Sequence, residues 1–323
     1  MNGSATFNRL DLSAYQGRDI AVLGLGISGQ SAATALQGAG ARVMAWDDSS
    51  ERRAAISAKG VSAVDLMGVD FKTVDALVLS PGIPHGHPHS HPMIDRARDA
   101  DCQIVCDLEL LTRVETDARY IGITGTNGKS TTTALIGHIL SETGIANAVG
   151  GNIGAPGLDL PAMGASGVYV LELSSYQLEL LPTAIFDIAI LLNITPDHLD
   201  RHGGMDGYVA AKQRIFDGQR SGQTAIVGID DAPSRGMFEG LRDGSDATLI
   251  PLSTHEACPG GIYVSEGWLI DDRNGTAQRV LELSSLETLP GAHNAQNVAA
   301  AYAASTVIAG AKHEKKQIAI IAA

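Results

Sequence analysis

The sequence predicts an α/β protein built from two doubly wound units of parallel β-sheet. Short apolar β-type runs alternate with helical patterns along most of the 323 residues. Each half also carries a glycine cluster between an expected strand and an expected helix. Near-continuous apolar segments such as 188–192 are typical of parallel strands covered on both faces.

The order of elements places the boundary between the two units near residue 107. In the first unit we expect strands at 19–24, 41–46, 76–79 and 103–105 and a helix from about 28 to 38. In the second we expect strands at 120–123, 167–173, 187–192 and 225–227 and a helix from about 130 to 142. A hairpin at 261–271 indicates a small β-rich appendage. The predicted domains are therefore 1–107 and 108–323.

Composition narrows the class of protein. The 23 Lys and Arg against 36 Asp and Glu give a net charge of −13, which is opposite to the basic surface that nucleic-acid binding needs. The Ala-rich stretch 298–311 is too short to span a bilayer and predicts a buried helix. Residues 1–10 lack the pattern of a signal peptide, and three irregularly spaced cysteines suit neither a disulfide framework nor a zinc site. We therefore expect a cytoplasmic protein.

The first glycine cluster is Gly24-Leu25-Gly26-Ile27-Ser28-Gly29, which matches G-x-G-x-x-G after a strand. Asp47, 21 residues after Gly26, ends the next strand, as in dinucleotide sites. Such a turn aims backbone N–H groups at an anion, so it suits any nucleotide diphosphate. A nicotinamide dinucleotide, a UDP-type nucleotide and a purely structural turn all remain open.

A second loop, Ser80-Pro81-Gly82-Ile83-Pro84, follows the expected strand 76–79 and so lies at the carboxyl edge of the sheet, where open α/β folds bind ligands. A structural loop is an equal alternative. Histidines 85, 87, 89 and 91 follow it; we interpret this segment as a solvated loop rather than a metal site.

The second glycine cluster, 122–131, reads GITGTNGKST between a strand and a helix. It departs from G-x-x-x-x-G-K-[ST], because Ile123 stands where the first glycine is expected. The loop can still bind phosphate despite this departure. Its backbone N–H groups would surround the phosphates, Lys129 would reach their oxygens, and Ser130 or Thr131 would offer a hydroxyl to Mg²⁺. The second unit is thus predicted to be a P-loop ATPase-type domain, and the reaction to consume ATP.

Several motifs in order resemble the Mur ligase and folylpolyglutamate synthetase superfamily, and within it the ligases that add D-glutamate. They are GTNGKST at 125–131, GGNIG at 150–154, LELSSYQLE at 171–179, NITPDHLDRHG at 193–203, YVAAKQRIF at 208–216 and GAHNAQN at 291–297. The resemblance covers nearly the whole chain. It implies that the first unit is a Rossmann-like domain for a UDP substrate and not for a nicotinamide.

The resemblance implies an ATP-dependent amide ligase of peptidoglycan precursor synthesis. In this family ATP phosphorylates the carboxylate of UDP-N-acetylmuramoyl-L-alanine, and the amine of D-glutamate attacks the resulting acyl phosphate. Because ATP and the carboxylate that it phosphorylates are both anions, metal ions must offset their negative charge. The implied cofactors are ATP and Mg²⁺ at two sites. We expect no nucleic-acid partner and no membrane insertion, and the activity does not require an oligomer.

The catalytic residues implied by the resemblance are Lys129, Glu172, His198 and Lys212. Glu172 with Ser130 or Thr131 would hold one Mg²⁺, and His198 with Lys212 would serve the second. A lysine cation cannot ligate a metal, so the family carbamylates it. From the residues alone, Glu172 in an apolar strand needs a metal or a base as partner, whereas His198 would be an ordinary loop histidine and Lys212 a solvated lysine.

The remaining contacts are also carried over from the family. The ATP-binding set is Gly125, Thr126, Asn127, Gly128, Lys129, Ser130, Thr131, Asn294 and Asn297. The set for the UDP substrate is Gly26, Ile27, Ser28, Asp47, Ser80, Gly82 and Asn152. Asn294 and Asn297 lie three apart on one helix face, and capping amides at a helix start are an equal alternative.

One departure bears on activity. The family has a third domain that brings the amino-acid site over the cleft, and this chain stops at residue 323. We therefore expect a two-domain chain with little turnover, because domain closure completes such sites. A sister ligase for another amino acid, a folylpolyglutamate-type synthetase, a non-catalytic UDP-binding fragment and an NAD-dependent oxidoreductase are the alternatives. The second of these lacks a domain like 1–107, which argues against it.

Overall fold

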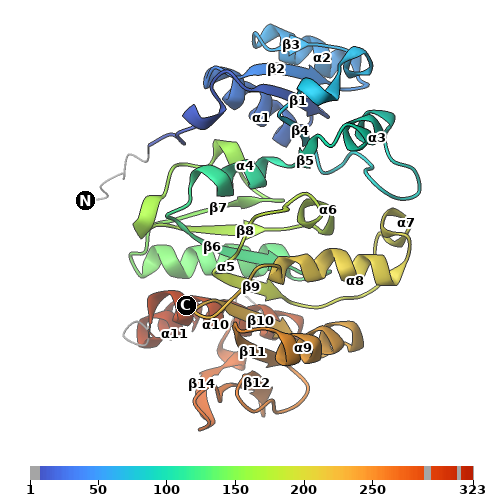
Figure 1. The fold of residues 1–323 in the computed structure, drawn as a ribbon. Helices are drawn as coiled ribbons and strands as arrows, with labels where there is room; N and C mark the ends of the chain where they lie inside the picture. The colour runs from blue at the N-terminus through green and yellow to red at the C-terminus, as the bar shows by residue number, and fades with distance from the viewer. Residues whose placement is uncertain (1–7, 287–291, 311–313, 323) are drawn as a thin grey trace.

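Two β-sheets follow one another along the chain in the structure, a computed structural model that describes residues 8–286, 292–310 and 314–322. Figure 1 shows the N-terminal sheet with its helices at one end of the molecule and the larger sheet beyond it. This confirms the predicted α/β class with a Rossmann-like first unit and a doubly wound second unit.

The first sheet has five parallel strands in the order β3-β2-β1-β4-β5. Its strands are β1 Asp19–Leu23, β2 Arg42–Trp46, β3 Ser62–Ala63, β4 Ala76–Leu79 and β5 Gln103–Val105, and its helices are α1 Ile27–Gly38, α2 Ser50–Ala58 and α3 Pro92–Asp99. The strand order reverses between β1 and β4. Both predicted ligand loops of this unit therefore leave the sheet at its topological switch point.

The second sheet has nine strands in the order β14-β13-β12-β11-β10-β9-β6-β8-β7. Its strands are β6 Arg119–Thr124, β7 Asn147–Gly151, β8 Val168–Glu172, β9 Ile188–Leu191, β10 Thr224–Gly228, β11 Thr248–Ser253, β12 Ile262–Ser265, β13 Trp268–Asp271 and β14 Gln278–Glu282. Its helices are α4 Asp107–Val114, α5 Lys129–Glu142, α6 Ser175–Leu178, α7 Leu199–His202, α8 Met205–Gln213, α9 Ala232–Gly244, α10 Ala292–Ala309 and α11 Glu314–Ala322.

The expected hairpin exists as β12 and β13, but it is the edge of the main sheet. Ile262 of β12 pairs in parallel with Leu252 of β11, and β13 and β14 continue antiparallel. The predicted β-rich appendage therefore extends the nine-stranded sheet by hydrogen bonding.

Alternate residues of the central strands pack on opposite faces, as a covered parallel sheet requires. Ile121 and Val170 belong to the core under α5 and α10, whereas Tyr120 and Leu171 belong to a core that continues into the first unit. The stretch predicted to be a buried helix lies mostly in α10, where 298–304 are buried. Among the described residues, no helix is long and apolar enough to cross a bilayer.

Candidate functional site

The loop between β6 and α5 has the shape of a phosphate-binding loop. Gly128 sits at the N-cap of α5 with φ +86°, and a Cβ there would lie 2.1 Å from Asn297 Oδ1. The loop is fastened to the end of β9, since the Thr126 N–H donates to the Asn193 carbonyl at 2.9 Å and the Asn127 N–H donates to Asn193 Oδ1 at 2.9 Å. The α5 N-terminus is thus presented at the carboxyl edge of the sheet.

Two lysines converge on this loop. Lys129 Nζ donates to the Gly125 carbonyl at 2.9 Å, and Lys212 Nζ donates to the same oxygen at 2.8 Å. Lys212 is only 1% exposed, so the sequence-based interpretation of a solvated lysine is wrong. Burial, followed by the neighbouring charge of Lys129, lowers the pKa of Lys212 to about 7. Burial likewise lowers the pKa of Lys129.

Glu172 ends β8 beside the loop and is 1% exposed. Its Oε2 accepts a hydrogen bond from Ser130 Oγ at 2.7 Å, and its Oε1 accepts one from Asn152 Nδ2 at 2.8 Å. Both donors are neutral, so this buried carboxylate has no directly bonded cation. The structure therefore brings Glu172, Ser130 and Asn152 together; Asn152 was predicted to contact the UDP substrate near the reaction centre.

The donors around Glu172 fit a Mg²⁺ ion. Carboxylate and hydroxyl oxygens are the ligands that Mg²⁺ takes, and it commonly relies on one or two carboxylates plus phosphates and water. In the described parts of the chain, no group of three or more His, Cys, Asp and Glu side chains could hold a metal by itself. An ion at Glu172 would thus depend on the nucleotide for further ligands.

His198 precedes α7 with φ +50° and a side chain that is 56% exposed. Its Nε2 lies 3.5 Å from Asp197 Oδ2. Among the contacts of the described residues, none joins His198 directly to Lys212; rings lie between them instead. These rings belong to Tyr176, His202 and Tyr208.

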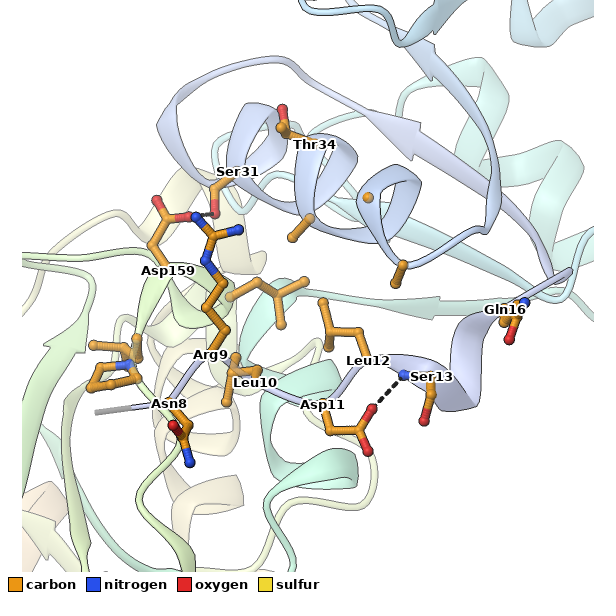
Figure 2. A pocket seen from close by; sticks show the side chains of 16 residues that line it. Asn8, Arg9, Leu10, Asp11, Leu12, Ser13, Gln16, Ser31, Thr34 and Asp159 are labelled. Carbon is orange, nitrogen blue, oxygen red and sulfur yellow. Dashed lines mark hydrogen bonds between the residues drawn. The ribbon is translucent and has the colours of Figure 1, made fainter. Parts of the chain in front are cut away.

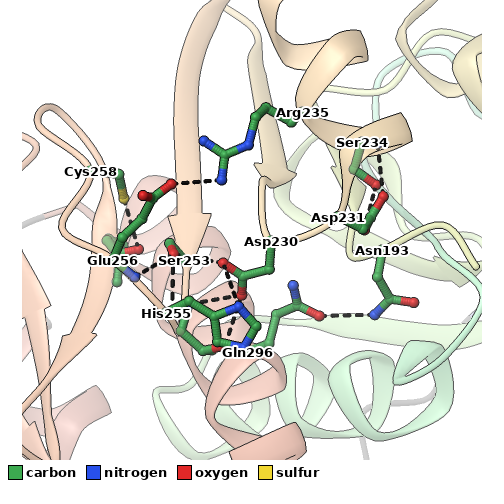
Figure 3. A network of polar contacts seen from close by, with 12 residues as sticks. Asn193, Asp230, Asp231, Ser234, Arg235, Ser253, His255, Glu256, Cys258 and Gln296 are labelled. Atoms are coloured by element: carbon green, nitrogen blue, oxygen red, sulfur yellow. Dashed lines mark hydrogen bonds and ion pairs between the residues drawn. The ribbon is translucent and has the colours of Figure 1, made fainter.

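A cavity of about 420 Å³ opens beside the loop. It is lined by Asn127, Gly128, Asn193, Thr195, Asp230, Asp231, Thr254, His255, Gln296 and Asn297. Figure 3 shows part of this wall, in which Asn193 Nδ2 donates to Gln296 Oε1 at 2.9 Å and Asp230 accepts from the Thr254 N–H at 2.8 Å. Asn193 and Asp230 were not predicted as site residues, although both follow strands at this edge.

Of the two asparagines of α10, Asn297 contacts α5 next to the loop, and Asn294 contacts Asn297. Asn297 Oδ1 accepts from Thr132 Oγ1 at 3.3 Å, and its Nδ2 donates to Asn294 Oδ1 at 3.1 Å. Asn297 is buried in the helix body and does not cap the helix start. Residue 291 of the GAHNAQN motif lies outside the described residues.

The candidate residues for the UDP substrate gather at the switch point of the first sheet, apart from Asn152. Gly24 and Ser80 touch closely enough that a Cβ on Gly24 would lie 2.7 Å from Ser80 Cβ. Gly26 and Ser28 are half-buried, Gly82 is exposed, and Ile27 is 80% exposed. These residues can therefore contact a ligand together at the switch point of the first sheet.

Asp47 is engaged within the protein. Its Oδ2 accepts from the Leu25 N–H at 2.7 Å and its Oδ1 from the Ser49 N–H at 2.8 Å. Burial opposes ionisation, but these bonds and Arg52 lower the pKa of Asp47. The carboxylate therefore holds the glycine turn in shape.

The histidine loop is only partly solvated. His87 and His89 are exposed, but His85 is buried, and its Nε2 lies 3.0 Å from Glu179 Oε2. His91 caps α3 by accepting the Met93 N–H at 3.3 Å. The prediction of a solvated loop is thus wrong for His85, which has a partner distant in sequence, and for His91, which caps a helix.

A second cavity, of about 910 Å³, lies between α1 and the segment 158–161 (Figure 2). Here Ser31 Oγ donates to Asp159 Oδ1 at 2.7 Å. None of the predicted site residues lines it. The chemistry-bearing side chains instead gather at the carboxyl edges of the two sheets.

The fold and the lysine-bearing loop define the class of doubly wound α/β proteins with a phosphate-binding loop. Residues 123–305 match the model of the Mur ligase middle domain. The chain therefore belongs to the Mur ligase family.

Among curated proteins, the chain is 48% identical over 301 residues to the UDP-N-acetylmuramoylalanine–D-glutamate ligase of Rhodospirillum rubrum, covering 91% of this chain and 63% of that protein. It is 46% identical over 308 residues to the ligase of the same name from Caulobacter vibrioides, covering 93% and 65%. The chain thus spans less than two thirds of the length of these relatives.

Solved structures share the fold at low identity. The UDP-N-acetylmuramate:L-alanyl-gamma-D-glutamyl-meso-diaminopimelate ligase from Neisseria meningitides gives a TM-score of 0.62 at 16% identity, covering 95% of this chain and 98% of that one. A murein peptide ligase from Psychrobacter arcticus gives 0.58 at 19% identity, covering 95% and 68%.

Proposed function

We propose that this chain carries the UDP-substrate and ATP sites of a ligase that joins D-glutamate to UDP-N-acetylmuramoyl-L-alanine. The observation that carries the proposal is the convergence of Lys129, Lys212 and the Glu172–Ser130 pair on one phosphate-binding loop. The names of the relatives at 46–48% identity support the choice of substrates.

The residues of the second unit divide the work of phosphoryl transfer. Lys129 swings from its loop carbonyls onto phosphate oxygens, and the α5 N-terminus offers N–H groups. Glu172 and Ser130 are the proposed holders of Mg²⁺, which when bound offsets phosphate charge. Asn152, held against Glu172, orients the acceptor carboxylate, and the Asn193, Gln296 and Asn297 wall receives the rest of the nucleotide.

Lys212 and His198 serve the acceptor side in this proposal. A buried amine with a pKa near 7 is largely neutral above that pH, and the neutral amine is the form that reacts with CO₂. Carbamylation would change Lys212 from a cation into an anionic oxygen donor for a second ion. His198, exposed at the start of α7, is close to the same stack of rings.

We further propose that 1–107 and 108–323 are two functional domains that share one hydrophobic core, with the UDP group bound on the first. The glycine turn at 24–29 and the loop at 80–84 meet at the switch point, where a diphosphate would find backbone N–H groups. Asp47 holds the turn in shape from within, through the N–H groups of Leu25 and Ser49.

A calorimetric titration with UDP-N-acetylmuramoyl-L-alanine in Mg²⁺ buffer tests the first half of the proposal, with NADH as control ligand. We expect saturable binding of the UDP compound and none of NADH. Binding of NADH alone would instead support an oxidoreductase. A phosphate-release assay with ATP, the UDP compound and D-glutamate, set against L-glutamate, tests the ligase chemistry and separates it from a binding fragment.

A further inference from the structure

Glu179, which follows α6, lies between two histidines from distant parts of the chain. Its Oε2 accepts a hydrogen bond from His85 Nε2 at 3.0 Å, and its Oε1 lies 3.6 Å from His202 Nδ1. His85 belongs to the loop after β4 of the first sheet, and His202 belongs to α7 of the second unit. One carboxylate therefore bridges the two units.

The His202 ring continues this contact toward the phosphate-binding loop. The ring is buried, shares a 2.9 Å hydrogen bond with Ser175 Oγ, and stacks on Tyr176 at 5.1 Å. On another side it meets Tyr208 at 5.4 Å. The Tyr208 hydroxyl shares a 3.1 Å hydrogen bond with Thr126 Oγ1, and the Tyr208 ring lies 4.7 Å from Lys212 Nζ.

The loop side of the bridge carries candidate substrate contacts. Ser80 and Gly82 open the same loop that ends in His85, and the Gly82 carbonyl accepts from Arg201 Nη2 at 3.4 Å. Arg201 also lies 4.8 Å over the Tyr176 ring. Loop 80–85 is thus fastened at two points to the elements that surround Lys212.

Glu179 is suited to this role by its charge. Burial raises the pKa of this carboxyl, but the neighbouring His202 and His85 outweigh burial and lower the pKa to about 2. The ionised carboxylate makes charge-assisted hydrogen bonds, which are shorter and stronger than neutral ones.

We propose that Glu179 is a positioning residue that couples loop 80–85 to the Tyr208–Lys212 segment of α8 through the His85–Glu179–His202 bridge. An occupied loop would then favour the placement of Lys212 and Thr126, so the UDP substrate and the nucleotide would assist each other's binding. The ligand part of this inference rests on the proposed function; the mechanical part does not.

The first test is amide hydrogen exchange on the chain without ligand. In His85→Leu, exchange rises about tenfold or more in the 175–179 and 199–212 segments, across the bridge from the substitution, because a charge-assisted bond is lost. His85→Gln keeps an N–H donor toward Glu179 and restores slow exchange. Glu266→Gln, at an exposed ion pair with Arg279, is the matched surface control and changes neither segment.

The second test is calorimetry with the UDP compound, and with an ATP analogue, on wild type and Glu179→Gln. We expect about tenfold weaker binding of the UDP compound and loss of mutual assistance between the two ligands. If wild type binds neither, the proposed function fails while the exchange test still decides the coupling. Unchanged exchange across the bridge in both His85→Leu and Glu179→Gln overturns the inference.

Discussion

At the residue scale, the most unusual group is the buried Lys212. Below pH 7 its ammonium is charged in the folded and the unfolded chain, and the folded chain bears the cost of desolvation. Between pH 7 and the ordinary value of 10.5, the folded form is neutral while the unfolded form still binds a proton. Its contribution to the free energy of unfolding therefore rises with pH across this window.

We expect Lys212→Met to raise the free energy of unfolding at pH 6 by on the order of 1–3 kcal/mol, because the desolvation cost is removed. The gain shrinks as the pH rises above 7. Denaturant unfolding at pH 6, 7.5 and 9 measures it. Lys72→Met, at an exposed lysine, is the control and gives no such trend. A gain that grows with pH would contradict the assignment.

The buried carboxyl group of Glu172 leads to a second prediction. In Glu172→Gln, the affinity for ATP in Mg²⁺ falls about tenfold or more, because a metal-binding carboxylate is lost, while binding without Mg²⁺ does not weaken. Calorimetry with and without EDTA makes the comparison, with Glu266→Gln as the matched change. Equal loss in both buffers would mean that Glu172 acts on the nucleotide without a metal.

Sequence patterns predicted individual residues unevenly. The expectation that Glu172 needs a metal or a base followed from one carboxylate in an apolar strand, whereas the partners in the structure are the neutral donors of Ser130 and Asn152. The burial of Lys212 did not follow, because the pattern of α8 is not strongly two-sided and the covering groups come from the loop at 124–125. Contacts made by residues far apart in sequence leave no local signal.

At the scale of elements, the turn from β6 into α5 depends on Gly128. Its left-handed φ and its contact with Asn297 leave no room for a side chain. We expect Gly128→Ala to cost about 1–3 kcal/mol in the free energy of unfolding and to abolish nucleotide binding, since the loop must shift. Thermal unfolding and ATP titration measure both. Gly144→Ala is the control, because Gly144 is also left-handed but has open space around it. This variant is strained but still binds ATP.

The strand β7 was not predicted, and its sequence gives a physical reason. The strand β7 reads Asn147-Ala-Val-Gly-Gly, with no run of β-branched residues. Its glycines are required by close packing: a Cβ on Gly151 would lie 2.3 Å from the Glu172 carbonyl oxygen. By contrast, the apolar strands β4 and β9 and the helices after both glycine clusters were predicted nearly to the residue. The apolar pattern thus predicted β4 and β9, and it missed β7, whose residues are set by a neighbour's backbone.

At the scale of the whole molecule, the two units share one hydrophobic core. The cluster that contains Leu23 and Leu77 of the first sheet also contains Leu108 of α4 and Leu171 of β8. Polar contacts cross as well, since Asp107 Oδ2 accepts the Gly157 N–H at 2.7 Å and Ser31 donates to Asp159. A boundary placed at residue 107 from motif order therefore divides two sheets that are packed together.

This shared core predicts that both units unfold together. The chain has two tryptophans, Trp46 in β2 and Trp268 in β13, so Trp268→Phe and Trp46→Phe each leave a fluorescent reporter in one sheet. We expect the two single-tryptophan variants to give the same guanidinium midpoint once each substitution's own effect on stability, measured by circular dichroism, is allowed for.

Adding Leu108→Ala sharpens this test, because Leu108 is fully buried where α4 contacts Gly157. Loss of its side chain costs about 2–5 kcal/mol, and in a shared core both reporters move to lower denaturant together. Leu269→Ala is the reciprocal substitution, because Leu269 is buried in the separate core beneath β13. If unfolding is cooperative across the sheets, this variant also moves both midpoints to lower denaturant. Two well-separated midpoints, with Leu108→Ala shifting only one of the two signals, would instead mean that the sheets are independent domains whose contact adds little stability.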